Sequence, residues 1–342
     1  MNEPYEPTTD APTGGDPGGA LDLLDRMRLR LPGEQVQIEA LSGGVSSDIW
    51  LIRSGSTSFV VKRPLEQLKV AADWRAPIDR GASEVAWLAY VDSVVPGACP
   101  KVLAYDRGTF AIALEYLDPA THLNWKSQLM AGDVDAGFAG AVGRDLGRIH
   151  GASARTPELQ ARFDHQDLLE SLRIEPYFLR TAEAVPEVRD ELHAIVDGIR
   201  GTRIALVHGD VSPKNILVGE RPVFLDAECA TWSDPAFDAA FCLTHLKLKE
   251  IHRPADAEAF ANAARAFESA YLAEADWEAP EQLRDRIARI IPALMLARVA
   301  GASPVEYLDD AARRTVGRLA RSALRSGRSI DETLQEEGAA HG

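Results

Sequence analysis

The sequence has few cysteines and no long apolar run, and it lacks the short motifs of several common enzyme classes. Its three cysteines, Cys99, Cys229 and Cys242, form no CxxC pair and are odd in number. This argues against a disulfide framework and against a thiolate zinc site. The sequence also contains no GxxxxGKS/T loop, no GxGxxG after a strand, no HExxH and no GxSxG. These absences exclude the commonest nucleotide-loop, dinucleotide-binding, zinc-protease and serine-hydrolase classes.

Positive charge is also scarce, because 37 Lys and Arg residues stand against 52 Asp and Glu residues and leave a formal net charge of −15. Such a chain repels nucleic acid and anionic membranes, so we expect neither as a partner. The acidic excess either steers a cationic small substrate or, as we favour, mainly keeps the protein soluble. The apolar stretch 290–297 is too short to span a bilayer, and residues 1–20 lack the pattern of a secretory signal. We therefore expect a cytoplasmic protein, as a monomer or homodimer.

Alternating apolar residues predict short strands in the first third of the chain. The runs lie at 36–40, 49–52, 59–61, 102–105 and 111–116. A helix is predicted at 82–91, where Val85, Leu88 and Val91 form an apolar stripe. Glu84 shares this stripe, and a carboxylate on a buried face needs a partner.

The rest of the chain has mainly helical periodicity. Apolar residues recur at helical spacing in five segments, at 138–149, 188–199, 237–248, 260–271 and 283–294. A β segment interrupts them, with a short apolar run at 204–207 and a predicted hairpin whose strands lie at 216–218 and 223–225. Such an isolated insertion indicates a loop built for a purpose.

The polar residues of this insertion suit phosphoryl transfer. Segment 208–215 has the sequence HGDVSPKN, and 225–228 has the sequence LDAE. Asp210 and Asn215 are five residues apart on one loop, and the predicted hairpin returns Asp226 to that loop. Phosphoryl transfer needs a carboxylate that accepts the proton of the attacking hydroxyl, and oxygen ligands that hold Mg²⁺. Two carboxylates and one amide can supply both.

The pattern HGDxxxxN, followed by an Asp after an apolar strand, resembles the aminoglycoside phosphotransferase and choline kinase family of small-molecule kinases. The resemblance extends from about residue 36 to about residue 310. It implies that Asp210 is the catalytic base, that Asn215 and Asp226 hold Mg²⁺, and that His208 braces the loop. It further implies Mg·ATP as phosphate donor and a small-molecule hydroxyl as acceptor.

Further residues match the nucleotide-binding positions of this family. Lys62 matches the lysine that contacts the α- and β-phosphates, and Glu84 matches its partner, which explains a carboxylate on an apolar stripe. A glycine-containing turn before the second strand would cover the phosphates, and the backbone of 114–117 would bond adenine. The implied residues are Ser42, Gly43, Gly44, Ser46, Lys62, Glu84, Glu115 and Leu117. Lys214 either reaches the γ-phosphate as a further member of this set or is a solvated surface lysine.

The resemblance implies an α+β, two-lobed protein-kinase-like fold, with a small antiparallel-sheet N-lobe, a mainly helical C-lobe and ATP between the lobes. We expect a disordered leader at 1–21 and the N-lobe at 22–117. The C-lobe, with the catalytic loop and the acceptor site, is expected at 118–325, and a flexible tail at 326–342.

Two other functions stay open. A nucleotide-binding pseudokinase or scaffold would use the same fold without turnover, although the intact Lys62, Asp210, Asn215 and Asp226 argue against it. A protein kinase is less favoured, because the HGD and DAE segments fit its HRD and DFG motifs poorly. The stretch between Asp226 and the next predicted helix is also short for an activation segment.

The acceptor is less defined by the sequence, and an amino sugar, an aminoglycoside, a sugar or an amino alcohol would each suit the family. Glu306, Asp309 and Asp310 lie in the region where this family builds its acceptor site. These acids either bind an amine or begin a helix, where negative charge interacts favourably with the helix dipole. We favour the helix start.

Overall fold

The computed structural model of the protein describes residues 17–31, 33–41, 46–67 and 76–341. The chain divides into two compact units. The first consists of Met1–Val85 and Lys101–Tyr116, and the second of Ala86–Pro100 and Leu117–Gly342. Strands dominate the first unit and helices the second.

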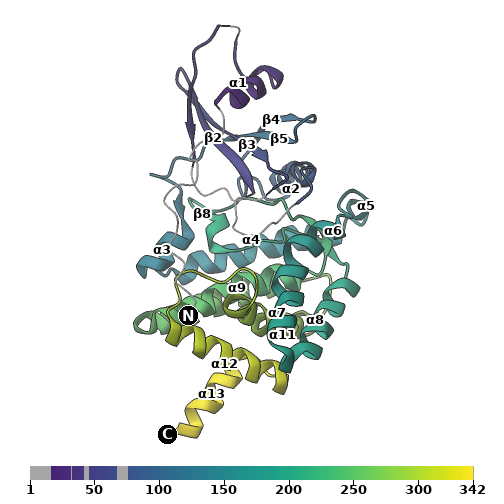
Figure 1. Ribbon diagram of the computed structural model, residues 1–342, viewed down its shortest axis with the longest axis vertical. Helices are drawn as coiled ribbons and strands as arrows, with labels where there is room; N and C mark the ends of the chain where they lie inside the picture. Colours follow the sequence, from purple (N-terminus) through teal and green to yellow (C-terminus); the bar gives the residue numbers. More distant parts are fainter. Residues whose placement is uncertain (1–16, 32, 42–45, 68–75, 342) are drawn as a thin grey trace, which may run out of the picture. The chain divides into compact units, whose positions relative to one another are not determined.

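The first unit is built on a five-stranded antiparallel sheet with strand order β1-β2-β3-β5-β4 (Figure 1). Each of the five predicted runs forms one strand, because alternation gives a strand one buried face. The strands are β1 (Gln37–Ala40), β2 (Ser47–Ser54), β3 (Thr57–Pro64), β4 (Val102–Asp106) and β5 (Ala111–Glu115). The register places Lys62 of the central strand β3 between Ile49 and Ile112 of its two neighbours.

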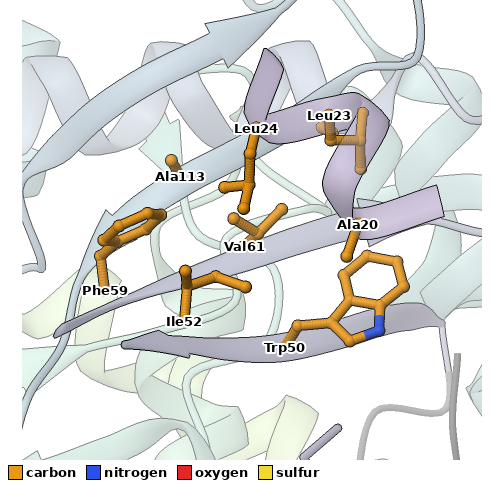
Figure 2. Close-up of a cluster of buried hydrophobic side chains, with 9 residues drawn as sticks. Ala20, Leu23, Leu24, Trp50, Ile52, Phe59, Val61 and Ala113 are labelled. Atoms are coloured by element: carbon orange, nitrogen blue, oxygen red, sulfur yellow. The ribbon is translucent and has the colours of Figure 1, made fainter. Parts of the chain in front are cut away.

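Helix α1 (Pro17–Arg26) packs on the apolar side chains of β2 and β3 (Figure 2). Its Leu23 and Leu24 are at most 3% exposed. The expected disordered leader at 1–21 is therefore wrong for residues 17–21, while residues 1–16 lie outside the described part. Burying a leucine side chain stabilises a fold by about 1.5–3 kcal/mol, and this contribution opposes the entropy cost of ordering a short segment rich in proline and glycine.

Helix α2 (Arg80–Val94) is shared by the two units, because the division falls within it. The Trp87 ring packs edge-on against His208 and Phe224, at centroid distances of 4.9 and 6.4 Å. Residues 86–100 therefore group with the second unit, which differs from the predicted N-lobe at 22–117.

The second unit is mainly helical. Its longer helices are α3 (Trp125–Ala131), α4 (Ala136–Ala154), α8 (Arg189–Gly201), α9 (Ala236–His252), α10 (Ala257–Ala273), α11 (Pro280–Ala300), α12 (Asp310–Ser326) and α13 (Ile330–His341). Its shorter ones are α5 (Leu159–Arg162), α6 (Gln166–Leu169), α7 (Arg180–Ala184), the π-helix η1 (Glu170–Leu179) and the 3₁₀ turns η2 (Pro186–Val188), η3 (Pro213–Asn215) and η4 (Pro254–Asp256). The five segments with helical periodicity correspond to α4, α8, α9, α10 and α11. Within the described ranges, no helix has both the length and the apolar character needed to cross a membrane.

Helices α4 and α10 pack against each other unusually closely. A Cβ atom on Gly143 of α4 would lie only 2.2 Å from the carbonyl oxygen of Phe267 on α10. Any side chain at this position would push the two helices apart, so glycine is required here.

Two small sheets lie in the second unit. Strand β7 (Ala205–Val207) pairs with β10 (Thr231–Ser233), and β8 (Ile216–Val218) pairs with both β6 (Leu123–Asn124) and β9 (Pro222–Phe224). The β7 run and the β8–β9 hairpin match the prediction, whereas β6 and β10 are not among the strands that the sequence predicts. Arg221, in the hairpin turn, donates to both oxygens of Asp145 on α4 at 3.0 and 3.1 Å, which anchors the hairpin.

The C-terminal part of the chain is more ordered than the sequence indicates. The expected flexible tail at 326–342 is wrong for residues 330–341, which form α13 at the end of α12 (Figure 1). Ile330 and Thr333 are each 3% exposed. Asp309 caps α12 by accepting a hydrogen bond from the Ala312 amide at 2.7 Å, and Asp310 is the first residue of the helix, so the favoured interpretation as a helix start is confirmed for these two residues. Glu306 lies before this helix and pairs with Lys126 instead.

Candidate active site

The loop that follows β7 begins with a glycine in a left-handed conformation. Gly209 has φ of +78°, and a Cβ atom there would lie 2.7 Å from the Cβ of Cys229. Both the backbone angle and the close approach require glycine. The chain can therefore turn sharply after His208 and bring Asp210 out of the strand direction.

Asp238, on the first turn of α9, anchors the start of this loop. Its carboxylate accepts hydrogen bonds from the amides of His208 and Gly209, at 2.6 and 2.8 Å. Nε2 of His150 also lies 3.2 Å from this carboxylate, and Nδ1 lies 2.9 Å from the hydroxyl of Tyr271. All of these groups are buried, so the start of the loop is fixed by a closed polar network.

His208 connects the loop to the chain segment that carries Asp226. The Asp210 amide donates to Nδ1 of His208 at 3.2 Å, so the proton of the neutral ring is on Nε2. Nε2 then donates to the carbonyl oxygen of Leu225 at 3.0 Å. Burial lowers the pKa of His208, more than its acidic neighbours raise it, and so favours this neutral form. The geometry agrees with the bracing role that the sequence indicates.

Asp210 is a buried carboxylate with two cationic neighbours. Its Oδ2 lies 3.0 Å from Nη2 of Arg173 and 3.2 Å from Nζ of Lys214, and its side chain is only 5% exposed. Burial alone would raise the pKa of Asp210, but Arg173 and Lys214 more than offset this, and the pKa lies below its usual value. Asp210 is therefore ionised at neutral pH, as a proton acceptor must be.

Asn215 and Asp226 present oxygen atoms near this carboxylate. The side-chain amide of Asn215 donates to the Asp210 carbonyl oxygen at 3.1 Å, which leaves its own carbonyl oxygen for another ligand. The Leu225 amide donates to the backbone carbonyl oxygen of Asn215 at 2.9 Å. This bond holds the segment that carries Asp226, the next residue, beside Asn215. Asp226 has φ of +67°, a strained conformation for a residue with a side chain.

These two residues fit a magnesium ion that takes its other ligands from a nucleotide and water. Mg²⁺ prefers hard oxygen ligands and is commonly held by one or two side chains plus substrate phosphates. In the described part of the chain, no group of three or more His, Cys, Asp or Glu residues could form a complete protein cage for a metal. A carboxylate and an amide oxygen match the open arrangement instead.

The first unit contains the ion pair that the sequence predicts. Nζ of Lys62 lies 3.0 and 2.7 Å from the two carboxylate oxygens of Glu84, and both side chains are buried. The need of Glu84 for a partner, inferred from the sequence, is thus met within this unit. The pair fixes the lysine at the end of the run that the sequence singled out.

Ser46 is held at the end of the predicted glycine turn, whereas Ser42, Gly43 and Gly44 lie outside the described residues. Its carbonyl oxygen accepts from the buried guanidinium of Arg80 at 2.5 Å and from the Leu65 amide at 2.9 Å. Arg80 also donates to three further carbonyl oxygens, those of Leu65, Ala76 and Pro77.

Of the remaining predicted residues, Glu115 ends β5, and its amide donates to the Lys101 carbonyl oxygen at 2.9 Å. Leu117 is half-buried two residues further on. Lys214 pairs with Asp210 at 3.2 Å, and its side chain is 56% exposed.

Comparison with known proteins gives a family. The sequence model of the phosphotransferase enzyme family matches residues 37–283, which is most of the chain. The chain belongs to this family. No curated protein sequence matches it.

Solved structures of kinases share the fold of this phosphotransferase-family protein. A choline kinase from Cryptosporidium parvum aligns with a TM-score of 0.56 and 10% identity, over 95% of this chain and 96% of that one. An ethanolamine kinase from Plasmodium vivax aligns with a TM-score of 0.52 and 16% identity, over 85% and 83%. A choline kinase from Streptococcus pneumoniae aligns with a TM-score of 0.52 and 13% identity, over 90% and 99%. At these identities the likeness shows the fold alone. The predicted family and fold class are confirmed.

Sequence reasoning missed Arg173 in this phosphotransferase-family protein. The residue lies on the π-helix η1, where its Nε donates to the Gly209 carbonyl oxygen at 2.5 Å in addition to the contact with Asp210. Its guanidinium carbon also lies 5.9 Å from the ring centres of Tyr177 and Phe241. A lone arginine 37 positions before Asp210 carries no local signal, because only the tertiary fold brings the two together.

Proposed function

We propose that this protein is an ATP-dependent phosphotransferase that moves the γ-phosphoryl group of Mg·ATP to a hydroxyl of a small molecule. The observation that carries the proposal is the state of Asp210, a buried carboxylate held ionised between Arg173 and Lys214. Asn215 lies on the same loop and donates to the Asp210 carbonyl oxygen, and Asp226 follows Leu225, whose amide donates to the backbone carbonyl oxygen of Asn215.

In this proposal Asp210 orients the acceptor hydroxyl and takes its proton. The acceptor oxygen forms a bond to the γ-phosphorus, the bond from this phosphorus to the bridging oxygen breaks, and ADP leaves with the electron pair. Arg173 holds Asp210 in one orientation and lowers its pKa, so that the carboxylate stays unprotonated before the hydroxyl arrives.

The magnesium ion would be held by Asp226 and the amide oxygen of Asn215. When bound, it neutralises phosphate charge and orients the γ-phosphoryl group. Lys62, fixed by Glu84, is assigned to the α- and β-phosphates of the nucleotide. Lys214 is assigned to the γ-phosphate, where its charge would offset the charge that develops during transfer.

The test is a screen that couples ADP release to a spectroscopic signal, with Mg·ATP and a panel of sugars, amino sugars, aminoglycosides, amino alcohols, nucleosides and hydroxy acids. A reacting compound defines the acceptor. The Asp210→Asn variant should then lose about 10²–10⁴-fold in kcat while keeping the KM for ATP, because a general base contributes this much.

Asp276→Asn is the matched control, because Asp276 is an exposed aspartate whose one ion-pair partner among the described residues is the exposed Arg155. It should keep the activity of the unchanged protein. Full activity in Asp210→Asn would remove Asp210 from its proposed role. A protein that neither binds Mg·ATP in a thermal-shift assay nor releases ADP with any compound would refute the proposed function as a whole.

A further inference from the structure

A set of basic and aromatic side chains lies next to the catalytic loop and is not explained by the phosphoryl-transfer chemistry. We call it the basic cluster and define it by three cations, Lys126 of α3, Lys249 of α9 and Arg298 of α11. Its aromatic members are Tyr177, Phe241, His245 and Tyr307. All of these residues belong to the second unit.

Contacts lead from Asp210 to the basic cluster without interruption. Arg173, which pairs with Asp210, lies over the rings of Tyr177 and Phe241 at 5.9 Å. Arg298 donates to the Tyr177 hydroxyl at 3.3 Å.

On α9, the Phe241 and His245 rings lie 5.4 Å apart. The ammonium of Lys249 lies 3.4 Å from the His245 carbonyl oxygen and 5.0 Å from the Tyr307 ring centre. The cluster is therefore a neighbour of the proposed transfer site.

Lys249 is the unusual member of this cluster. Lys249 is only 1% exposed, yet it forms no ion pair with any described residue. Burying a cation without a carboxylate is costly, so such a group is normally paired. The buried hydroxyl of Tyr307 and Nε of Arg298 also have no hydrogen-bond partner among the described residues.

The charge of the cluster is positive, although the protein as a whole is strongly acidic. Its cations are Lys126, Lys249 and Arg298, and the carboxylate that faces them is Glu306, which is 67% exposed and paired with Lys126. Arg298 instead bonds to Ser303 and Tyr177. Two buried or half-buried cations thus remain without a carboxylate partner in the described part of the chain.

We propose that the basic cluster binds an anionic group of the acceptor, a carboxylate or a phosphate, while the acceptor hydroxyl lies at Asp210. Lys249 and Arg298 are the residues that bind the anion, and the rings of Tyr177, Phe241 and Tyr307 contact the carbon skeleton. This inference rests on the proposed function. It selects hydroxy acids or phosphorylated alcohols over the amines and neutral sugars that the sequence left open.

The chemistry of an anionic ligand fits the unpaired groups. A carboxylate or phosphate beside Lys249 would supply the missing counter-charge and accept a hydrogen bond from the Tyr307 hydroxyl. An ammonium group would add a fourth cation and raise the cost of burial. The acids at Asp309 and Asp310 do not change this balance, because they form the first turn of α12.

The first experiment compares alcohols that share one carbon skeleton and differ in a single group. One set is glucuronate, glucose, glucosamine and a glucose phosphate, and a second is para-hydroxymethyl benzoate with the matching amide, amine and phosphate ester. Binding to the Mg·ADP form of the full protein is measured by calorimetry, and ADP release with Mg·ATP is measured in parallel. We expect at least tenfold tighter binding of the anionic members than of the neutral ones, because a hydrogen bond to a charged group is stronger than one to a neutral group.

The carboxylate and phosphate members distinguish the two sources of anion. Preference for either one supports the proposal and names the group. If only cationic or neutral members bind or react, or if no anionic member does either, the proposal is wrong.

The second experiment replaces one lysine at a time on the same helix. Lys249→Met should weaken binding of the preferred anionic compound at least tenfold and raise its KM, with the KM for ATP unchanged. Lys247→Met is the control, because Lys247 lies two residues earlier on α9 but pairs with Asp331 and Glu250. An equal loss in both variants, or no loss in Lys249→Met, would overturn the assignment.

The two proposals fail in different ways. Turnover of amines or neutral sugars that is lost in Asp210→Asn and kept in Lys249→Met would uphold the phosphotransferase and reject the anion site. Conversely, anion binding that depends on Lys249, in a protein that never releases ADP, would uphold the anion site and reject the phosphotransferase.

Discussion

Two buried lysines of this protein are treated in opposite ways. Lys62 in the first unit lies between the two oxygens of Glu84, at 2.7 and 3.0 Å. Lys249 in the second unit is buried still more completely, and in the described part of the chain its nearest hydrogen-bond acceptor is a carbonyl oxygen at 3.4 Å. The fold therefore pairs one buried lysine with a carboxylate, whereas the other has no carboxylate partner in the described part of the chain to offset the cost of its desolvation. A cost that the fold could have avoided with an apolar residue indicates a use for the charge.

The largest effect is expected when the paired lysine loses its carboxylate. Glu84→Gln leaves Lys62 without this partner in a buried position. The free energy of unfolding should fall by about 3–5 kcal/mol, the typical result of removing one member of a buried ion pair. Urea denaturation of the two proteins measures the difference. A loss below about 1 kcal/mol would show that the two lysines differ less than their contacts indicate.

A second effect concerns the cation that is paired with the proposed base. Arg173→Met removes the guanidinium next to Asp210, so the pKa of Asp210 should rise toward and above its usual value. Activity requires the ionised carboxylate and is lost as the pH falls through this pKa. The acidic limb of the kcat/KM profile should therefore move to higher pH, with a fall of roughly tenfold or more at neutral pH.

Arg173→Lys is the partner variant, since it keeps a charge but not the geometry. It should recover part of the shift in the pH profile. A purely structural role would lower stability in Arg173→Met and leave the position of the acidic limb unchanged.

Replacing Lys249 is expected to change the free energy of unfolding in the opposite direction to Glu84→Gln. Lys249→Met should raise the free energy of unfolding by about 1–3 kcal/mol near pH 6, because it replaces a buried cation by an apolar chain of similar length. Burial lowers the pKa of Lys249 to about 7, from an ordinary value of 10.5. The titratable groups around it are Lys126, Cys242, Arg298 and Glu306.

The sign of the pH dependence follows from these values. Between about pH 7 and 10.5 the unfolded chain binds one proton more at this site than the folded protein, so this group's contribution to stability rises with pH. The advantage of Lys249→Met should therefore be largest below pH 7 and shrink above it. Urea denaturation of both proteins at several pH values measures it. A constant difference would mean that Lys249 is not the group that titrates.

The smallest effect is expected at the neighbouring lysine of α9. Lys247→Met removes ion pairs with Asp331, whose side chain is 61% exposed, and with Glu250. Such pairs contribute up to about 1 kcal/mol, so stability should fall slightly. A rise in the free energy of unfolding for Lys249→Met and a fall for Lys247→Met would separate the effect of pairing from the effect of burial. A change of the same sign in both variants would contradict the comparison of paired and unpaired lysines.

Much of the fold could be predicted from the sequence, because strand and helix periods record which face is buried. The five strands of the first sheet and the helices α4, α8, α9, α10 and α11 all have such a period. The helix α1 was missed, since its proline and glycine content resembles a disordered segment and its burial depends on the sheet. The π-helix η1 contains Pro176 and has no regular apolar spacing.

The candidate site was predictable where its residues are close in sequence. Asp210, Asn215 and Asp226 lie on one loop and its hairpin, so their order in the chain already places them together. Arg173 and the basic cluster come from helices that are distant in sequence, and only packing reveals them. Asp309 and Asp310 stand out in the sequence as candidates for binding an amine, but their role is structural. The start of a helix favours the same acidic residues.

The close approach of α4 and α10 at Gly143 has a consequence for synthesis of the protein. The two helices are separated by the segment 155–256, which includes the loop that carries Asp210. During synthesis α4 emerges from the ribosome long before α10, so its glycine-lined face cannot yet pack against its partner helix. The second unit can therefore complete its core only after residue 273 has emerged, and until then this face of α4 stays exposed to solvent.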